Sequence, residues 1–108
     1  MKISLEDHRS GGALVFSGRE RGRAVRQSTE LRNFDPESEG VIEVVAPKDT
    51  IIVTSSFLLG MLGPIIRELG ENESHSRIII SGPVNEKTIE ETIKEALRGD
   101  EPLTEPDQ

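Results

Sequence analysis

The sequence has no cysteine, tryptophan or tyrosine, and it holds three phenylalanines among 108 residues. The lack of cysteine excludes disulfide bonds, thiolate nucleophiles and cysteine-ligated metals. Proteins that bind single-stranded nucleic acid usually stack its bases on aromatic side chains, so this sequence has almost no residues for that mode of binding. The hydrophobic core therefore has to be built from isoleucine, leucine and valine.

Long apolar runs are also missing. The longest apolar-rich stretch, residues 57–66, is interrupted by Gly60, Gly63 and Pro64 and is too short to span a bilayer. The first seven residues lack the basic segment and apolar run of a signal peptide. These features predict a cytoplasmic protein for which a membrane is not the partner.

Charge is distributed unevenly along the chain. The net charge is −7, with +3 on residues 1–34 and −10 on residues 35–108. An acidic body disfavours nucleic acid and anionic lipid as principal partners. The length predicts one domain with one core over residues 1–99, and the acidic composition beyond it predicts a disordered tail over residues 100–108.

The first third of the sequence predicts two strands and a helix. Apolar segments at residues 3–5 and 13–16 flank Ser10-Gly11-Gly12, a pattern typical of a β-hairpin. A helix is predicted over residues 19–33, although Gly22 costs it about 1 kcal/mol relative to alanine. The inner face of this helix is expected to consist of Ala24, Val25, Ser28 and Leu31.

Three β-branched runs, residues 41–45, 50–54 and 77–81, predict further strands. The first two are expected either to form a hairpin or to follow one another within one sheet. Continuous apolar runs of this kind are typical of strands that are buried on both faces.

Two further helices are predicted. The helix over residues 56–70 has a wide apolar face, and Pro64 is expected to kink it before Gly70 ends it. The last helix is expected to start after an Asn85 cap and to end at Gly99, with an inner face of Ile89, Ile93, Ala96 and Leu97. The alternation of strands and helices predicts a small α/β domain in which helices pack on a mixed β-sheet.

The first candidate site is Thr54-Ser55-Ser56, where a predicted strand ends and an apolar helix begins. Free backbone N–H groups and the positive end of the helix dipole favour an anion at such a junction. A phosphate on Ser55 or Ser56 would be stabilised there. The alternative is that one of these serines caps the helix.

A second candidate is the group of five arginines between residues 19 and 32. On a helix, Arg19, Arg23 and Arg26 share one face, and their guanidinium groups suit a phosphate, a nucleotide or an acidic surface. The alternative is a solvated helix face that the acidic surface of the same protein balances.

Other motifs carry weaker signals. Ser81-Gly82 follows the last β run, where α/β folds often place ligands, but the motif is also a common turn. His8 and His75 both fall in predicted loops without a second ligand at helical spacing. We therefore expect no metal, no cofactor and no catalytic centre.

Residues 41–69 resemble the centre of a STAS domain, the fold of bacterial anti-sigma-factor antagonists. The resemblance lies in a strand, a turn, the segment from Thr50 to Gly60 and an apolar helix, and the order of the flanking elements fits across residues 12–98. More narrowly, the chain resembles an uncharacterised STAS-like group in which Ser-Ser-Phe follows the strand.

In the antagonists the strand ends in Asp-Ser-Ser-Gly, and a partner kinase of the histidine-kinase-like ATPase type phosphorylates the first serine. In this sequence Thr54 falls on the aspartate, Ser55 on the phosphorylated serine and Ser56 on the second serine. Phe57 falls on the glycine. The resemblance thus implies Ser55 as the phosphorylation site.

The resemblance implies a non-enzymatic regulatory module that binds a protein, such as a kinase-like ATPase or an anti-sigma-type regulator. The residues implied in partner binding or phosphorylation are Thr54, Ser55, Ser56, Phe57 and Leu58, with an exposed apolar patch near residues 57–59. The alternative function is a sensor of a small anion or nucleotide. Its binding residues would be Arg19, Arg23, Arg26, Ser81 and Gly82. The sequence leaves open whether the domain forms a homodimer.

Overall fold

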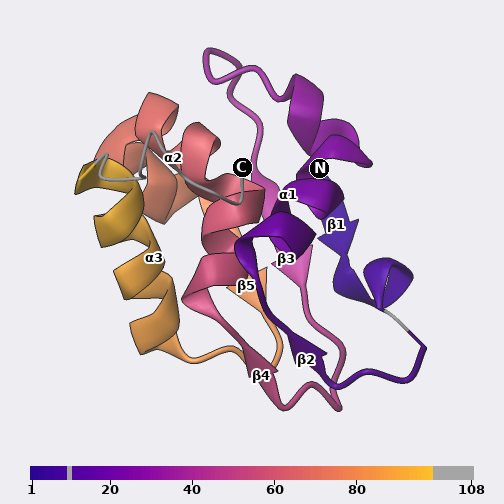
Figure 1. Cartoon of the computed structure of the whole chain (residues 1–108). Coiled ribbons are helices and arrows are strands. Elements are labelled where there is room, and N and C mark those ends of the chain that lie inside the picture. The colour runs from indigo at the N-terminus through magenta and orange to yellow at the C-terminus, as the bar shows by residue number, and fades with distance from the viewer. Residues whose placement is uncertain (10, 99–108) are drawn as a thin grey trace.

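The computed structural model describes residues 1–9 and 11–98 (Figure 1), so the predicted acidic tail over residues 100–108 lies outside the described residues. The elements follow one another as β1 (Lys2–Ser4), η1 (Leu5–His8), β2 (Val15–Phe16), α1 (Arg19–Gln27), η2 (Glu30–Asn33), β3 (Ile42–Val45), β4 (Ile52–Val53), α2 (Ser55–Arg77), β5 (Ile78–Ser81) and α3 (Glu86–Arg98). The α/β class, with helices packed against strands, is confirmed.

The strands form two small parallel sheets. One has the order β1-β3-β5, with Ile3, Val44 and Ile80 in register, and the other pairs β2 with β4. The prediction of a hairpin over residues 3–16 is wrong, because η1 separates β1 from β2 and buried Leu5 holds η1 against the core. The two expectations for β3 and β4 are also wrong, since these strands belong to different sheets.

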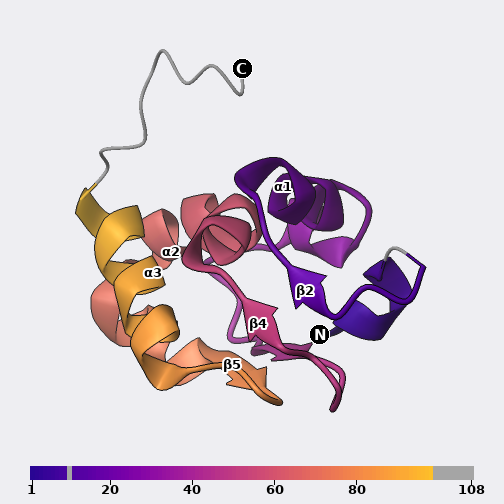
Figure 2. The ribbon, with the colours of Figure 1, turned by 60° about the horizontal axis from the view of Figure 1, so that its bottom comes forward.

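The helices cover one face of the strand layer. Figure 2 shows α1, α2 and α3 on the same side of the strands, with α2 between the other two. The core fills the space between, and α2 contributes its largest share with Phe57, Leu58, Met61, Leu62, Ile65 and Ile66. The prediction that the strands are buried on both faces is wrong, since nothing among the described residues covers their other side and Ile79 of β5 is 48% exposed.

The bend in α2 lies at Gly70. Pro64 keeps helical backbone angles because its fixed φ suits a helix and it forfeits only one ladder bond. Gly70 instead adopts φ 83° and ψ 174°, which glycine accepts at no steric cost. The predicted kink at Pro64 is therefore wrong, and the helix resumes after Gly70 to end at Arg77, which places His75 on a helix instead of in a loop.

Helices α1 and α2 cross at two glycines. A Cβ on Gly22 would overlap the carbonyl oxygen of Phe57 and lie 2.9 Å from the amide nitrogen of Met61. A Cβ on Gly60 would overlap the carbonyl oxygen of Arg19. Gly22 is thus not a weakness of α1 but the residue that lets the two backbones touch.

The first helix is shorter than predicted. It ends at Gln27, and Thr29 starts η2 by accepting a hydrogen bond from the Leu31 amide while its hydroxyl donates to the Val25 carbonyl at 2.8 Å. Gly22, Val25 and Leu31 face the core, whereas Ala24 and Ser28, both predicted to point inward, are exposed. In α3, by contrast, the predicted Asn85 cap is confirmed, because its side chain accepts from the Lys87 amide at 2.7 Å.

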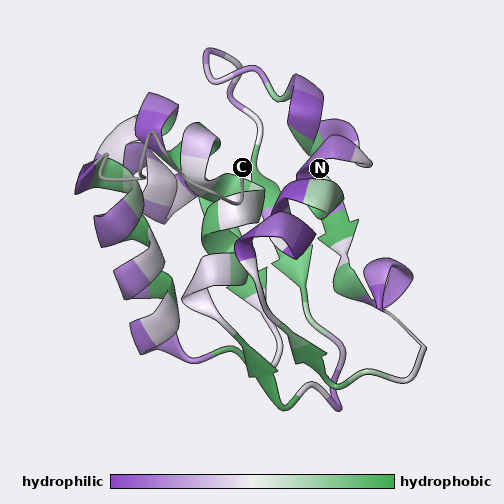
Figure 3. Cartoon of the chain, viewed as in Figure 1, coloured by the Kyte–Doolittle hydropathy of each residue, from purple (hydrophilic) through white to green (hydrophobic). Residues whose placement is uncertain are grey.

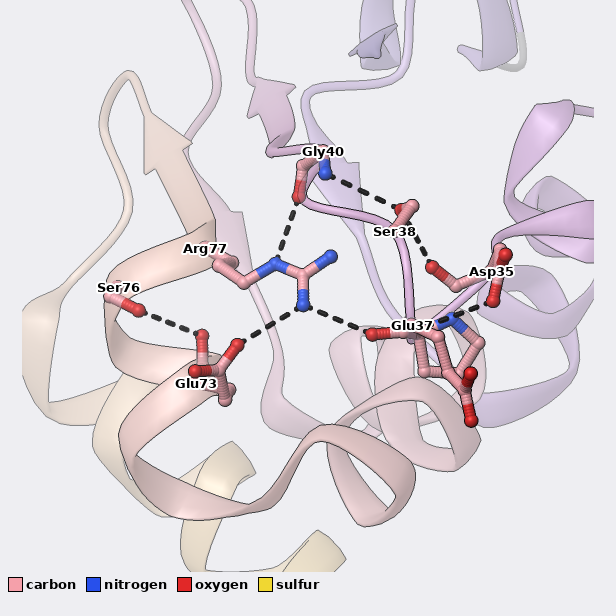
Figure 4. A network of polar contacts seen from close by, with 8 residues as sticks. Asp35, Glu37, Ser38, Gly40, Glu73, Ser76 and Arg77 are labelled. Carbon is pink, nitrogen blue, oxygen red and sulfur yellow. Dashed lines mark hydrogen bonds and ion pairs between the residues drawn. The ribbon is translucent and has the colours of Figure 1, made fainter.

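Arg77 ties the end of α2 to the segment before β3 (Figure 4). Its guanidinium donates to the carbonyl oxygens of Gly40 at 2.9 Å and Pro36 at 3.1 Å, and it pairs with Glu73 at 3.1 Å. It also lies over the ring of Phe34, 5.5 Å from the ring centroid. These contacts hold residues 34–40 against the end of α2.

The glycine crossing gives the first prediction. Gly22→Ala should lower the free energy of unfolding by at least about 2 kcal/mol, because the new methyl group meets backbone atoms that cannot move aside. Chemical denaturation measures this change. The matched control is Gly63→Ala in α2, whose Cβ would find its nearest neighbour at 3.9 Å. The free energy of unfolding of this control should be unchanged or rise by up to about 1 kcal/mol, because alanine has the better helix propensity. Equal losses in both variants would contradict the role of Gly22 at the helix crossing.

Candidate functional site

Thr54 is the point at which strand β4 becomes helix α2. Its amide donates to the Phe16 carbonyl at 3.0 Å, so the residue still belongs to the β2–β4 pairing. Its hydroxyl oxygen accepts from the Phe57 amide at 3.2 Å, and its carbonyl accepts from Leu58 at 3.2 Å. Thr54 is therefore the N-cap, and the prediction that Ser55 or Ser56 caps the helix is wrong.

Ser55 and Ser56 are the first two residues of α2. Ser55 is half-buried and Ser56 is exposed. The backbone amides of Ser55 and Ser56 have no acceptor within the helix. The next amide along, that of Phe57, donates to the hydroxyl oxygen of Thr54. Together with the positive end of the helix dipole, they provide a setting that stabilises negative charge on either serine.

Phe57 and Leu58 are core residues. Both are buried almost completely, and the Phe57 ring packs against that of Phe16 at a centroid distance of 5.6 Å. Leu59 is partly buried against the same core. The predicted exposed apolar patch at residues 57–59 is therefore wrong, because the first turn of α2 faces the two-stranded sheet.

An exposed apolar patch does exist on the two strands that lead into α1 and α2. Its members are Leu14, 36% exposed, Val15, 39%, Ile51, 69%, and Ile52, 47%. Val15 and Ile52 are register partners, and the Ile51 amide donates to the Leu14 carbonyl at 2.8 Å, so Leu14 and Ile51 lie side by side directly before the two strands. We call these four residues the apolar strip. Figure 3 shows the hydrophobic colour of β2 and β4 at the lower edge of the molecule.

The strip and the serines adjoin. Ile52 lies two residues before Thr54, and the inward side chains of the same strands, Phe16 and Val53, are buried. The alternation within these short strands therefore sends one side chain into the core and the next into solvent. Sequence reasoning missed the strip because the runs around Ile51 and Val15 read as buried strands.

The residues of the alternative anion site are not brought together. Arg19, Arg23 and Arg26 are half-buried on α1, in the helical layer. Ser81 ends β5 and Gly82 follows it, and Figure 2 shows β5 well apart from α1. Gly82 has φ 104°, and a Cβ there would lie 2.5 Å from the Ala46 carbonyl oxygen, so a close backbone approach accounts for this glycine.

In residues 1–9 and 11–98, no three His, Asp or Glu side chains gather in a way that could hold a metal ion. Within the same ranges, no helix has both the length and the apolar character needed to cross a bilayer.

Arg9 and Asp49 form an ion pair that sequence reasoning missed. The guanidinium of Arg9 contacts both carboxylate oxygens of Asp49, at 2.6 and 3.2 Å, and it also pairs with Glu6 at 3.2 Å. The hydrogen bond from Arg9 holds the pKa of Asp49 below its ordinary value. The pair joins the chain after η1 to the turn between β3 and β4, and the 40 residues that separate its members hide it from any local pattern.

Comparison of the chain with family models, with curated proteins and with solved structures finds no match in any of the three. The STAS-like resemblance therefore stays a prediction, as do the site residues that it implies.

The Arg9–Asp49 pair gives the second prediction. Because the pKa of Asp49 is lowered in the folded protein, the pair stabilises the fold above the ordinary carboxyl pKa of 3.8, and this contribution is lost progressively as pH falls from there through the lowered pKa of the folded state. Urea denaturation between pH 7 and pH 3 should show that Asp49→Asn loses less stability on acidification than the natural chain. Asp7→Asn, which changes an exposed carboxylate of η1 outside the pair, should keep the natural pH dependence. If the free energy of unfolding falls with pH equally in Asp49→Asn and in the natural chain, the stabilising role of the pair is refuted.

Proposed function

We propose that this chain is a non-enzymatic regulatory module that binds a protein partner through the apolar strip, with the adjoining serines as its control point. The observation that carries the proposal is the exposure of four large apolar side chains on and directly before two paired strands. Contiguous apolar surface on a soluble domain commonly marks an interaction site, and burying it on a partner is favourable.

The shape of the strip favours a protein over a small molecule as the partner. Val15 and Ile52 lie on the outer face of β2 and β4, Leu14 and Ile51 directly precede these strands, and the Ile51 side chain is more than two-thirds exposed. A small ligand needs a concave site that buries most of its own surface, whereas a partner protein can cover a row of side chains on a sheet.

The serines supply a means of control. A phosphate on Ser55 or Ser56 would add up to two negative charges beside the strip, and the free amides of the first helical turn would hold it in place. Transferring that charge into an apolar contact is unfavourable, so phosphorylation would release a partner seated on the strip. The resemblance to anti-sigma-factor antagonists supports Ser55 as the modified residue and a kinase-like ATPase as the partner.

The geometry bears on the two positions at which this chain departs from the Asp-Ser-Ser-Gly motif. Thr54 caps α2, and aspartate is favoured at the same position for the same reason, so this exchange preserves the start of the helix. Phe57 points into the core against Phe16 and does not stand between solvent and Ser55. Neither exchange obstructs a kinase at Ser55.

The third prediction tests the strip. A partner captured from cells with the natural chain should bind Ile52→Ser at least about tenfold more weakly, because an exposed anchor of this size contributes more than 1 kcal/mol to a typical interface. Ile79→Ser is the matched control, since Ile79 has the same exposure as Ile52 but lies on the other sheet. Calorimetric titration of both variants with the partner measures the two affinities. Equal affinities would exclude the apolar strip as the partner-binding surface.

The fourth prediction tests the serines. Incubation with the partner kinase should phosphorylate the natural chain and Ser56→Ala but not Ser55→Ala. Ser55→Asp should weaken partner binding, while Ser55→Ala should bind like the natural chain. If the natural chain, Ser55→Ala and Ser55→Asp all bind alike, the switch is excluded, although the strip can still bind a partner without it.

A further inference from the structure

Strand β5 forms one edge of the three-stranded sheet. It pairs with β3, and no other strand within residues 1–9 and 11–98 pairs with it. The Ala46 amide donates to the Ser81 carbonyl at 2.9 Å, so Ser81 turns its backbone groups toward β3. Successive residues of a strand turn these groups to opposite sides, so the N–H and C=O of Ile80 point away from β3. We call this unpaired side of the strand the β5 edge.

Ile80 is the residue at which the β5 edge is open. The Ile78 amide lies on the same side of the strand, but it donates to the Ser74 carbonyl at the end of α2. The N–H and C=O of Ile80 have no partner among the described residues. A strand edge with a free donor and a free acceptor can pair with another extended segment.

The side chain of Ile80 is incompletely covered as well. Ile3, Val44 and Ile80 form one row across the core side of the sheet. Ile3 is 4% exposed and Val44 is fully buried, whereas Ile80 is only partly buried. The core is thus closed beneath β1 and β3 and left open at the β5 edge.

The two edges of the sheet differ in charge. Strand β1, at the opposite edge, contains Lys2 and directly follows the N-terminal ammonium group, and such charges hinder pairing between sheets. Strand β5 consists of three isoleucines and one serine, and its register with β3 has no bulge. It therefore lacks the charge, proline or bulge that commonly keeps a natural sheet edge from pairing.

We propose that the β5 edge pairs with the β5 edge of a second copy of this chain. In an antiparallel pairing about a two-fold axis, Ile80 lies opposite Ile80 of the second copy, and the two residues exchange both N–H···O bonds. Their Cα atoms are then about 5.5 Å apart, so each side chain covers the open end of the other core. Two sheets of three strands become one sheet of six, a common size.

The symmetry of the edge favours a second copy over an unrelated peptide. The free donor and the free acceptor both belong to Ile80, so a two-fold axis beside this residue satisfies all four groups of the two copies at once. The side chains of Ile79, 48% exposed, become diagonal neighbours on the outer face, about 7–8 Å apart. The β5 edge contains no residue of the apolar strip, so the second copy and the proposed protein partner occupy different surfaces.

Charges placed at Ile79 test this pairing. By analytical ultracentrifugation the natural chain should have the mass of two chains at about 1 mM. Ile79→Lys and Ile79→Glu, each alone, should self-associate at least about fivefold more weakly, because like charges then lie across the two-fold axis. A mixture of the two variants should recover the dimer, which damage to the fold would not allow. Ile52→Lys changes an outward residue of equal exposure on the other sheet, and this matched control should self-associate like the natural chain.

Amide hydrogen exchange supplies a second measurement at the paired residue. Exchange of the Ile80 amide should slow as the concentration of the natural chain rises, because its hydrogen bond to the second copy protects it from water. In Ile79→Lys the same amide should exchange at a rate that does not depend on concentration.

Three results would overturn the proposal. A natural chain that stays monomeric up to about 1 mM would show that the β5 edge does not pair with its own copy. A dimer that Ile52→Lys disrupts and Ile79→Lys does not would place the contact on the apolar strip. If Ile79→Lys and Ile79→Glu are monomeric both alone and mixed, the antiparallel pairing about Ile80 is wrong.

Discussion

The close approach of α1 and α2 at Gly22 and Gly60 is the constraint on which the rest of the structure depends. Strand β2 ends two residues before α1, and β4 ends one residue before α2, so the crossing of the helices also sets the distance between these strands. A pairing of two residues on each side is too short to be stable alone. The helix contact therefore holds the strands parallel, and the strands in turn aim the starts of both helices.

The same arrangement explains why an apolar strip is exposed at all. All three helices lie on one side of the strands, so each inward side chain on β2 and β4 has a partner in the core and each outward one does not. Thr54 then converts the edge of the two-stranded sheet into a helix start without a loop. The apolar strip and the two serines are adjacent for this reason, and the proposed control of binding by phosphorylation rests on that adjacency.

Two arginines outside the proposed sites fasten the irregular segments. Arg9 holds the turn between β3 and β4 through Asp49, and Arg77 holds residues 34–40 through backbone carbonyls and the Phe34 ring. Each guanidinium offers several donors in a fixed plane, which lets one side chain satisfy partners from distant parts of the chain. Such contacts define loops that have no regular pattern of their own.

The sequence by itself determined the α/β class, the positions of most strands and helices, the Asn85 cap and the strand-to-helix junction at Thr54, because these follow from local periodicity and capping chemistry. It could not decide which strands pair, where α2 bends or which side of each strand is covered. Those features depend on contacts between residues far apart in the chain, such as Gly22 with Phe57 and Val15 with Ile52. An apolar run looks the same in sequence whether one face or both are buried. Only the placement of the helices on a single side exposed Ile52 and buried Phe57.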